Sequence, residues 1–476
     1  MYWVAGIFAA ILLGCADRYG YHRDEMYFLA AGRRLDWGYA DQPPLVPLIA
    51  RGISSIDPNS LILLRVPAIL ATSAVVLCAG WMARELGGGR VAQTLSTAAV
   101  AASALVMAAG HQLGTTVFDL AIWCGLTLLV MRLLRTDFQP HRWLPIGALA
   151  GIGLQDKALM AIPLVVLALS LALAGPRKIF ATRYFALAIG IAGVLVLPYL
   201  WWQGSNGWPQ WELSRSIAGG SSGTSNSPLA FVLLQFGLMG PLLVPLWIFG
   251  LYRLSRDIRY HAFALTYALL FLIFTLTGGK AYYLGGMYPL LLAAGAVGLA
   301  PKLRDHRMRA AAVAFAVAVN AAVSAVLFLP ILPISDLPDS PVLAVNYDAG
   351  ETIGWPAFVR RIADARSRFA PDADILTANY GEAAAIERFG PAYGLPVPHS
   401  AHNAYWWWGP PAEGRPVLTV GLNPGRLARL CTTPELVGRI DNGVGIDNDE
   451  QGRSLYLCRS VLLPWRDTWP TLRMLG

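Results

Sequence analysis

The sequence contains little charge for its length. Only 14% of its 476 residues are Asp, Glu, Lys or Arg, whereas 55% are hydrophobic. A water-soluble protein needs more polar surface than these residues supply, so the composition excludes an ordinary soluble globule. The mean hydropathy of +0.49 and several nearly uncharged stretches long enough to cross a bilayer predict a polytopic membrane protein.

Nucleotide-binding and metal-binding motifs are also missing. The sequence has no glycine-rich dinucleotide loop, no phosphate-binding loop and no Cys/His spacing typical of zinc. We therefore expect no cofactor and no soluble nucleotide donor. The net charge of +8 does not indicate nucleic acid, because in a membrane protein the positions of Arg and Lys matter more than their sum.

Basic residues gather in alternate loops between the apolar stretches. Cytoplasmic loops carry an excess of Lys and Arg, so we place these clusters in the cytoplasm. The alternation fits about eleven spans, with the amino terminus inside and the carboxy-terminal region outside. We therefore expect a multi-pass protein of a bacterial cell membrane, surrounded by membrane lipids. The clusters occur at residues 84–90, 132–142, 177–183, 253–259 and 302–309.

The composition divides the chain near residue 335, where Asp, Glu and Asn return. We expect a transmembrane domain at 1–334, with a long external loop at 17–60, and an extracytoplasmic α/β domain at 335–476. The external loop shows helical patterns at 24–34 and 44–56. In the second domain the patterns predict helices at 356–368 and 382–389 and strands at 375–378, 417–420 and 455–458.

Cysteine is scarce, and three of the five cysteines lie in or at apolar stretches. The other two, Cys431 and Cys458, fall in the region that we place outside the membrane. Oxidising conditions there permit a disulfide, so we predict that these two cysteines pair. Two unpaired, buried thiols are the alternative.

The densest group of polar residues follows the first apolar stretch. Carboxylates at a helix start complement the helix dipole, so capping is one interpretation. Catalysis is the other, because charges beside a bilayer usually have a function. A metal site is also conceivable, but adjacent residues rarely complete a coordination sphere, and we predict no metal. The group comprises His22, Arg23, Asp24, Glu25 and Tyr27, and Asp41 begins a proline-rich turn further along the same loop.

Further candidates lie in or beside the apolar stretches. Asp119 falls inside one of them, where a carboxylate is costly and is therefore a functional candidate, with a structural hydrogen bond as the alternative. His111 lies in the adjacent external loop and could face the same cavity. Lysine and tyrosine at a membrane boundary can bind phosphate or simply anchor the chain. The residues of this kind are Lys157, Lys280, Tyr282 and Tyr283.

Aromatic residues form two clusters, at 201–211 and at 405–408. The first is typical of a belt at the membrane interface. The second could belong to a core, dock onto the membrane or offer a platform to a sugar, and the sequence does not separate these alternatives.

Several motifs follow one another in a specific order. His22-Arg23-Asp24-Glu25-x-Tyr27 and Asp41-Gln42-Pro43-Pro44-Leu45 are followed by Asp119, Lys157 and Gly279-Lys280-Ala281-Tyr282-Tyr283. This order resembles glycosyltransferase family 39 over roughly residues 1–300. That family includes the protein O-mannosyltransferases and the lipid A aminoarabinose transferases. The resemblance implies an α-helical polytopic protein with the C-type glycosyltransferase fold.

The resemblance also implies an activity. The expected enzyme transfers a sugar from a polyprenyl-phosphate lipid to an external acceptor, which is a glycan, a lipid or a protein, with inversion at the anomeric carbon. Asp24 would be the general base and Glu25 would assist it. The implied donor site comprises Lys280, Tyr282, Tyr283, Arg23 and Lys157.

The residue types suit this chemistry independently of the resemblance. Phosphate is already a good leaving group, so the departing side needs cationic and hydrogen-bonding groups rather than a general acid. The acceptor, in contrast, needs a base such as a carboxylate.

A transporter or flippase for a lipid-linked or small polar substrate is the alternative function. Asp119, Lys157 and Lys280 could line a pathway through the membrane. Transporters commonly contain repeated halves with interrupted helices, and we find no internal repeat in this sequence. The functional candidates also gather on one side of the membrane, which favours a one-sided active site.

Overall fold

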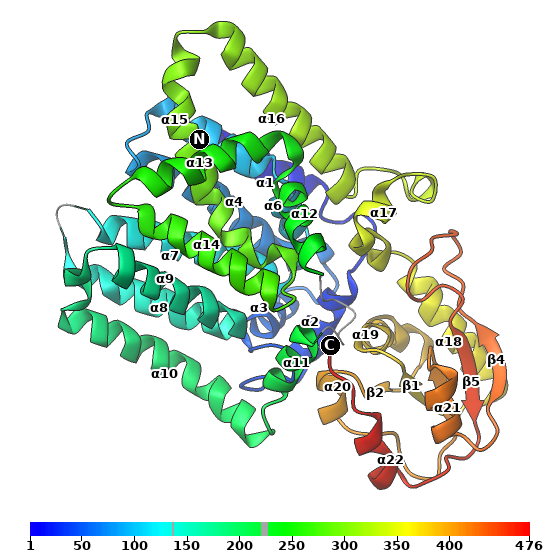
Figure 1. The fold of residues 1–476 in the computed structure, drawn as a ribbon. Helices are drawn as coiled ribbons and strands as arrows, with labels where there is room; N and C mark the ends of the chain where they lie inside the picture. Colours follow the sequence, from blue (N-terminus) through cyan, green and yellow to red (C-terminus); the bar gives the residue numbers. More distant parts are fainter. Residues whose placement is uncertain (136–137, 220–226) are drawn as a thin grey trace.

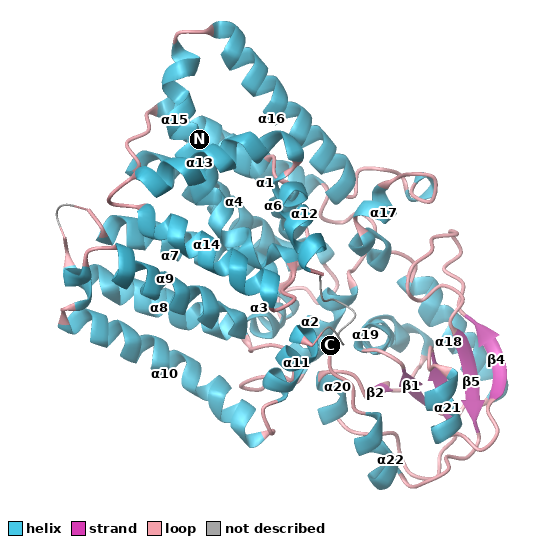
Figure 2. Cartoon of the chain, in the orientation of Figure 1, coloured by secondary structure: helices cyan, strands magenta, loops and turns pink. Residues whose placement is uncertain are grey.

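The computed structural model describes residues 1–135, 138–219 and 227–476. Helices form most of the molecule, and a small sheet lies near the carboxy terminus (Figures 1 and 2). The loop at 17–60 contributes α2 (Arg23–Arg33) and α3 (Leu45–Ser54), as the sequence predicts. The helices of the membrane-embedded part and its edge are α1 (Tyr2–Gly14), α4 (Leu61–Glu85), α5 (Arg90–Ala101), α6 (Ala104–Gly110), α7 (Thr115–Leu133), α8 (Trp143–Asp156), α9 (Ala161–Ala174), α10 (Arg183–Ser205), α11 (Pro209–Ala218), α12 (Pro228–Met239), α13 (Val244–Arg256), α14 (His261–Leu276), α15 (Tyr288–Arg304) and α16 (Arg307–Phe328).

Five helices of the described chain are long and apolar enough to cross a membrane. They are α4, α7, α10, α16, and α15 together with the preceding 3-10 helix η5 (Ala281–Met287). The number rises to seven if two bent pairs each count as one span: α5 with α6, bent by 62°, and α12 with its continuation into α13, bent by 85°. The multi-pass architecture is confirmed. The expected count of eleven spans is not, because helices such as α1 and α14 are shorter than a full span.

The two bent pairs share one hydrogen-bonding partner. The Asn320 side-chain amide on α16 donates to the carbonyl oxygens of Ala102 (2.9 Å) and Met239 (3.1 Å), which lie at the two breaks. A carbonyl freed by a helix break must find another partner inside a membrane. Gly240 adopts a φ of +92° at the second break, and a Cβ there would collide with the Asn320 amide. The breaks are therefore built into the fold.

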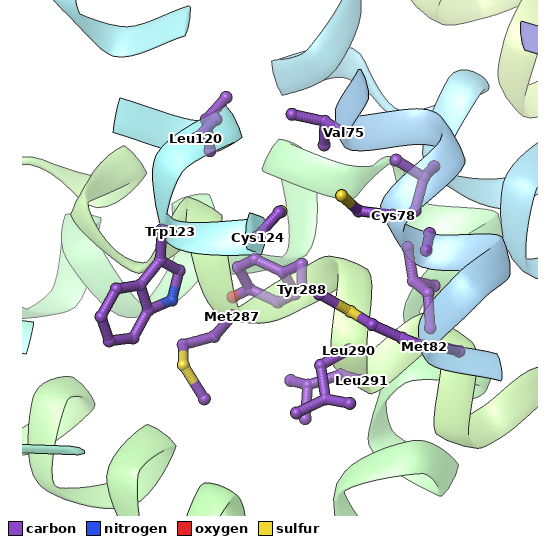
Figure 3. Packing of buried hydrophobic residues seen from close by; sticks show 14 of the residues in the cluster. Val75, Cys78, Met82, Leu120, Trp123, Cys124, Met287, Tyr288, Leu290 and Leu291 are labelled. Atoms are coloured by element: carbon purple, nitrogen blue, oxygen red, sulfur yellow. The ribbon is translucent and has the colours of Figure 1, made fainter. Parts of the chain in front are cut away.

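The membrane-embedded core is assembled from large side chains on α4, α7 and α15 (Figure 3). Trp123 and Cys124 of α7 lie with Tyr288 of α15 among aliphatic and sulfur-containing side chains. Glycine brings α13 and α15 close together, because a Cβ on Gly250 would collide with the backbone of α15 and a Cβ on Gly295 with that of α13. Small residues permit such backbone approach between membrane helices.

The carboxy-terminal sheet is mixed, with strand order β2-β1-β3-β5-β4. Strand β1 is parallel to β2 and β3, and β5 is antiparallel to β3 and β4. The three expected strands are present as β1, β3 and β5. The sequence patterns miss β2, which has two residues, and β4, an exposed edge strand with an irregularity near Gly438. The strands are β1 (Asp374–Thr377), β2 (His399–Ser400), β3 (Val417–Val420), β4 (Glu435–Arg439) and β5 (Ser454–Cys458).

Helices cover both faces of this sheet. Helices α18 (Trp355–Phe369) and α19 (Tyr380–Phe389), both expected from the sequence, share one hydrophobic core with it. Helices α21 (Pro424–Leu430) and α22 (Trp465–Leu472) pack on the other face. Buried residues of α2 and α3 belong to the first of these cores. The external loop and the carboxy-terminal region are therefore held together by continuous packing.

Cys431 and Cys458 form a disulfide, with their Cα atoms 5.6 Å apart. It joins the end of α21 to the end of β5, across 27 residues of sequence. Both cysteines are buried beneath α22 in the second core. Closing a loop of this length stabilises a fold by about 2–4 kcal/mol.

We predict that the Cys431→Ser/Cys458→Ser double variant loses stability in this region by about 2–4 kcal/mol. Limited proteolysis of the full chain in detergent should then cleave the segment containing β4 at a lower temperature. Reductant should have the same effect on the wild type and no added effect on the variant. Unchanged protease resistance of the reduced wild type would contradict the prediction.

Candidate active site

The site begins at the first turn of α2. The His22 side chain accepts a hydrogen bond from the Asp24 backbone (3.2 Å), and the Glu25 carboxylate accepts one from the His22 backbone (2.9 Å). This reciprocal arrangement is a capping box, in which side chains satisfy the free N–H groups of the helix start. It turns Glu25 inward and leaves the Asp24 side chain partly exposed.

Glu25 is engaged by a buried ion pair with Arg65 of α4. The guanidinium donates to the two carboxylate oxygens at 2.9 and 2.8 Å, and the Leu113 backbone donates a further bond of 2.9 Å. Both charged residues are 0% exposed. Burial alone would raise the pKa of Glu25, but Arg65 and these hydrogen bonds hold it below its usual value. We expected Glu25 to assist the base; its contacts instead give it a positioning role.

Asp24 has the more open carboxylate, with 41% of its side chain exposed. One oxygen accepts a hydrogen bond of 2.7 Å from the Tyr380 hydroxyl on α19. The other oxygen lies 3.9 Å from the His22 ring, beyond hydrogen-bonding distance. One oxygen of Asp24 is therefore held by Tyr380, and the other is available to accept a proton.

Arg23 points into the carboxy-terminal region. Its guanidinium lies 3.3 Å from Glu351 and 3.4 Å from Asp449, and it stacks over the Tyr347 ring at 5.8 Å. Two carboxylates thus balance its single charge. We expected Arg23 to contact a donor phosphate. Its contacts instead link α2 to the carboxy-terminal region.

Lys157, in contrast to Arg23, contacts aromatic rings. Its ammonium lies 4.9 and 5.3 Å from the ring centres of Tyr282 and Tyr283. Within the described residues this buried ammonium has no hydrogen-bond partner. A buried cation held against two aromatic faces is ready to accept an anion.

Lys280 lies between this aromatic group and α2. Burial lowers its pKa, as does the neighbouring charge of Lys157, while Asp24 and Asp348 act in the opposite direction. Lys280 therefore lies within electrostatic reach of both Lys157 and Asp24. The sequence expectation that joined Lys157, Lys280 and the tyrosines corresponds to a real cluster in the structure.

Two carboxylates stand behind Lys157. They are Asp119 and Asp156, and Asp119 interacts electrostatically with both Lys157 and Asp156. Both Asp156 oxygens are buried and have no hydrogen-bond partner in the part of the chain that the structure describes. The sequence analysis missed Asp156, although its position directly before Lys157 was a usable signal.

Two other candidates lie away from the lysines. Asp41 accepts hydrogen bonds from Tyr27 (2.7 Å) and Asn403 (3.2 Å), and burial raises its pKa to about 6. His111 was expected to face the cavity of Asp119, but its 6% exposed ring lies beside the Arg65–Glu25 pair. Burial, followed by the charge of Arg65, lowers the pKa of His111 to about 4.

The carboxy-terminal region completes the site through contacts that local sequence patterns do not predict. Tyr380 holds Asp24, Glu351 pairs with Arg23, and Asp348 lies 3.8 Å from His22. Burial would lower the pKa of His22, but Asp348 and Asp24 raise it above its usual value. Among the described residues, no group of three or more His, Cys, Asp or Glu side chains is placed to hold a metal ion.

Known proteins resemble the chain in sequence. Residues 41–202 match the family model described as dolichyl-phosphate-mannose-protein mannosyltransferase. Over 243 residues the chain is 25% identical to the lipid A galacturonosyltransferase RgtD of Rhizobium johnstonii. That alignment spans about half of each protein, 49% of this chain and 49% of the relative.

Solved structures match nearly the whole chain. The crystal structure of ArnT from Cupriavidus metallidurans in the apo state has a TM-score of 0.63 at 14% identity, covering 95% of this chain and 96% of that one. The chain has the C-type glycosyltransferase fold. The crystal structure of ArnT bound to undecaprenyl phosphate superposes on this fold with a TM-score of 0.60 at 14% identity, covering 95% and 97% of the two chains. The match of residues 41–202 to that family model and the shared fold agree with the resemblance to family 39.

Three carboxylates of the carboxy-terminal region are buried near Arg23. Glu351, Glu382 and Glu450 are each at most 4% exposed, and Asn379 donates a hydrogen bond of 3.3 Å to Glu450. Burial, together with the charge of Glu351, raises the pKa of Glu450 to about 7. Burial and the charge of Glu450 also raise the pKa of Glu382. These acids are protonated more readily in the folded protein than in the unfolded chain.

We predict that Glu450 makes the free energy of unfolding fall between about pH 4.5 and 7. Its pKa is raised on folding, so its contribution is complete below the unfolded pKa and is lost as the pH rises through the folded pKa. Glu450→Gln should flatten this part of the pH profile in thermal unfolding of the full chain. The exposed Glu435→Gln is the control, and parallel profiles for wild type and Glu450→Gln would contradict the prediction.

We also predict that Glu25→Gln destabilises the protein by about 3–5 kcal/mol, because it leaves the buried Arg65 charge unpaired. Asp24→Asn, one residue away and half-exposed, should cost less than about 1 kcal/mol. Denaturant unfolding in detergent would measure both. If the two variants were equally stable, Glu25 would not have the structural role described above.

Proposed function

We propose that this protein is a membrane glycosyltransferase that moves a sugar from a polyprenyl-phosphate lipid to an acceptor on the external face of the membrane, with inversion. The supporting observation is the placement of Asp24, which keeps one free carboxylate oxygen, within electrostatic reach of Lys280, which in turn lies within electrostatic reach of Lys157. A base and a phosphate site on opposite sides of one reacting carbon are what this transfer requires.

Asp24 acts as the general base in this proposal. Its free oxygen takes the proton of the acceptor hydroxyl while the acceptor oxygen bonds to the anomeric carbon. The Tyr380 hydrogen bond, 2.7 Å long, keeps the carboxylate oriented. Glu25 contributes indirectly, because its pairing with Arg65 fixes the helix turn that carries Asp24.

The two lysines receive the leaving group. As the bond between the anomeric carbon and the phosphate oxygen breaks, its electron pair stays on the phosphate. The ammonium of Lys157 has no hydrogen-bond partner among the described residues, so a phosphate there would supply one. Tyr282 and Tyr283 hold that ammonium by their ring faces. Lys280 adds a second positive charge on the side nearer Asp24.

The lipid class follows from the fold relative. ArnT with the same fold binds undecaprenyl phosphate, which supports a polyprenyl phosphate as the carrier here. The name of the Rhizobium relative places galacturonic acid and lipid A among the first donors and acceptors to test, beside mannose, arabinose and aminoarabinose. External placement of residues 17–60 and 335–476, and a bacterial source, remain part of this proposal.

The transporter alternative predicts a different distribution of polar groups. A pathway would continue through the membrane, whereas Lys280 lies within electrostatic reach of Asp24 on α2, which Tyr380 of α19 also contacts. We therefore favour transfer over transport.

We predict that Asp24→Asn and Lys280→Ala fail differently. Asp24→Asn removes the proton acceptor and should slow transfer by about 100- to 10,000-fold, with donor binding preserved. Lys280→Ala should weaken donor binding as well as turnover, because it removes a charge that faces the phosphate in both ground and transition states. Lipid-donor binding and single-turnover transfer in nanodiscs would separate the two effects.

Matched controls exist in the chain. Asp17→Asn removes an exposed carboxylate near α2, and Lys178→Ala removes an exposed lysine far along the sequence from the site. Both variants should transfer sugar at the wild-type rate. Near wild-type transfer by Asp24→Asn would show that the base is another residue.

A further inference from the structure

A separate cavity of about 280 Å³ opens where the end of α10, the first external loop and α20 (Ala404–Trp407) meet. Its volume lies near the lower end of the range for small-molecule pockets, roughly 300 Å³ and above. Figure 1 shows the end of α10 next to α11 and α20, close to α2. Its lining includes Trp202, Trp407, Trp408, Asp36, Ser205 and Asn206.

The cavity has a fixed frame. The Trp202 indole donates a hydrogen bond of 2.8 Å to Asp36, and the Trp37 backbone donates another of 2.7 Å to the other oxygen. The Gln203 side chain donates 3.0 Å to the Tyr39 carbonyl. A Cβ on Gly38 would collide with the Tyr199 ring and crowd the Trp202 ring. Asp36 is exposed yet held in position, and each of its oxygens retains a lone pair for a further donor.

The aromatic walls come from two domains. Trp202 on α10 and Trp407 on α20 have ring centres 6.2 Å apart. Arg473 stacks on Trp407 at 5.0 Å and pairs with Glu212 of α11 at 2.7 Å. This pairing fixes the outer wall and balances the charge of Arg473.

A second arginine is balanced in the same way. Arg34 stacks on Trp408 at 4.4 Å and pairs with Glu387 at 3.0 Å. The charged residue among those that line the cavity is Asp36. The cavity therefore combines indole faces with one carboxylate.

We propose that this cavity binds a sugar ring of the acceptor, uncharged or carrying an amine. The C–H faces of a sugar pack against indole rings, and its hydroxyl or ammonium groups donate to a carboxylate. A phosphate would be repelled by Asp36. A lipid chain would remove that carboxylate from water without replacing its hydrogen bonds, which is costly.

The cavity is distinct from the site at Asp24. Tyr380, which bonds Asp24, packs on Tyr27 with ring centres 4.7 Å apart, and Tyr27 lies 6.4 Å from the Trp408 ring. Two aromatic rings thus separate the two sites. A glycan that extends past them could place one sugar in the cavity and its reacting hydroxyl at Asp24. This inference rests on the proposed transfer reaction for the identity of the ligand.

The test measures saccharide binding without turnover. Full-length protein in nanodiscs is titrated with glucosamine disaccharide, with N,N′-diacetylchitobiose and with inorganic phosphate, and binding is followed by saturation-transfer NMR. We expect both disaccharides to bind and phosphate not to compete with them. Trp407→Ala should weaken binding roughly two- to tenfold, as loss of an aromatic contact does. Asp36→Asn should weaken the glucosamine disaccharide more than the acetylated one.

Two controls keep this test separate from the proposed reaction. Trp211→Ala removes an indole that is 62% exposed and does not line the cavity, and it should bind as the wild type does. Asp24→Asn should also bind the disaccharides normally, even if it transfers no sugar. Equal binding by wild type and Trp407→Ala, equal losses in Trp407→Ala and Trp211→Ala, or preferential binding of phosphate would overturn the proposal.

Discussion

The pairing of Glu25 with Arg65 is the contact on which the site depends. Two charges that are 0% exposed are tolerable only because each is matched by the other and by backbone groups. Arg65 also donates to the carbonyls of Ala16 and Gly20, so one guanidinium joins α4, the end of α1 and the entry to α2. Asp24 is the next residue along from Glu25. Because Glu25 is held in the interior, the neighbouring Asp24 side chain remains partly exposed.

A second constraint comes from the core shared by α2, α3, α18 and α19. Because α19 packs on α2, the Tyr380 hydroxyl reaches Asp24 and the carboxylate of Glu351 reaches Arg23. The site is thus composed of residues more than 300 positions apart in sequence. Neither the membrane-embedded helices nor the sheet domain contains it alone.

Local patterns in the sequence were sufficient for the elements whose side chains repeat regularly. The helices α2 and α18 and the strand β3 follow from amphipathic or apolar periodicity, and the motif order was sufficient for the fold class. These patterns do not predict which side chains contact one another. The resemblance assigned the base to Asp24, but local patterns could not show that Glu25 is buried in an ion pair, because its partner Arg65 lies forty residues away. The count of eleven spans was not confirmed, because apolar composition does not reveal that helices such as α1 and α14 are shorter than a full span.

The amide of Asn320 links the breaks of the two bent helix pairs mechanically. A single side chain on α16 donates to one carbonyl in each bent pair, so neither pair can straighten without losing its hydrogen bond to the amide that both pairs share. Helix α16 leads directly into the segment that carries Asp348 and Glu351. A shift of α16 would therefore change the hydrogen bonds at both breaks together.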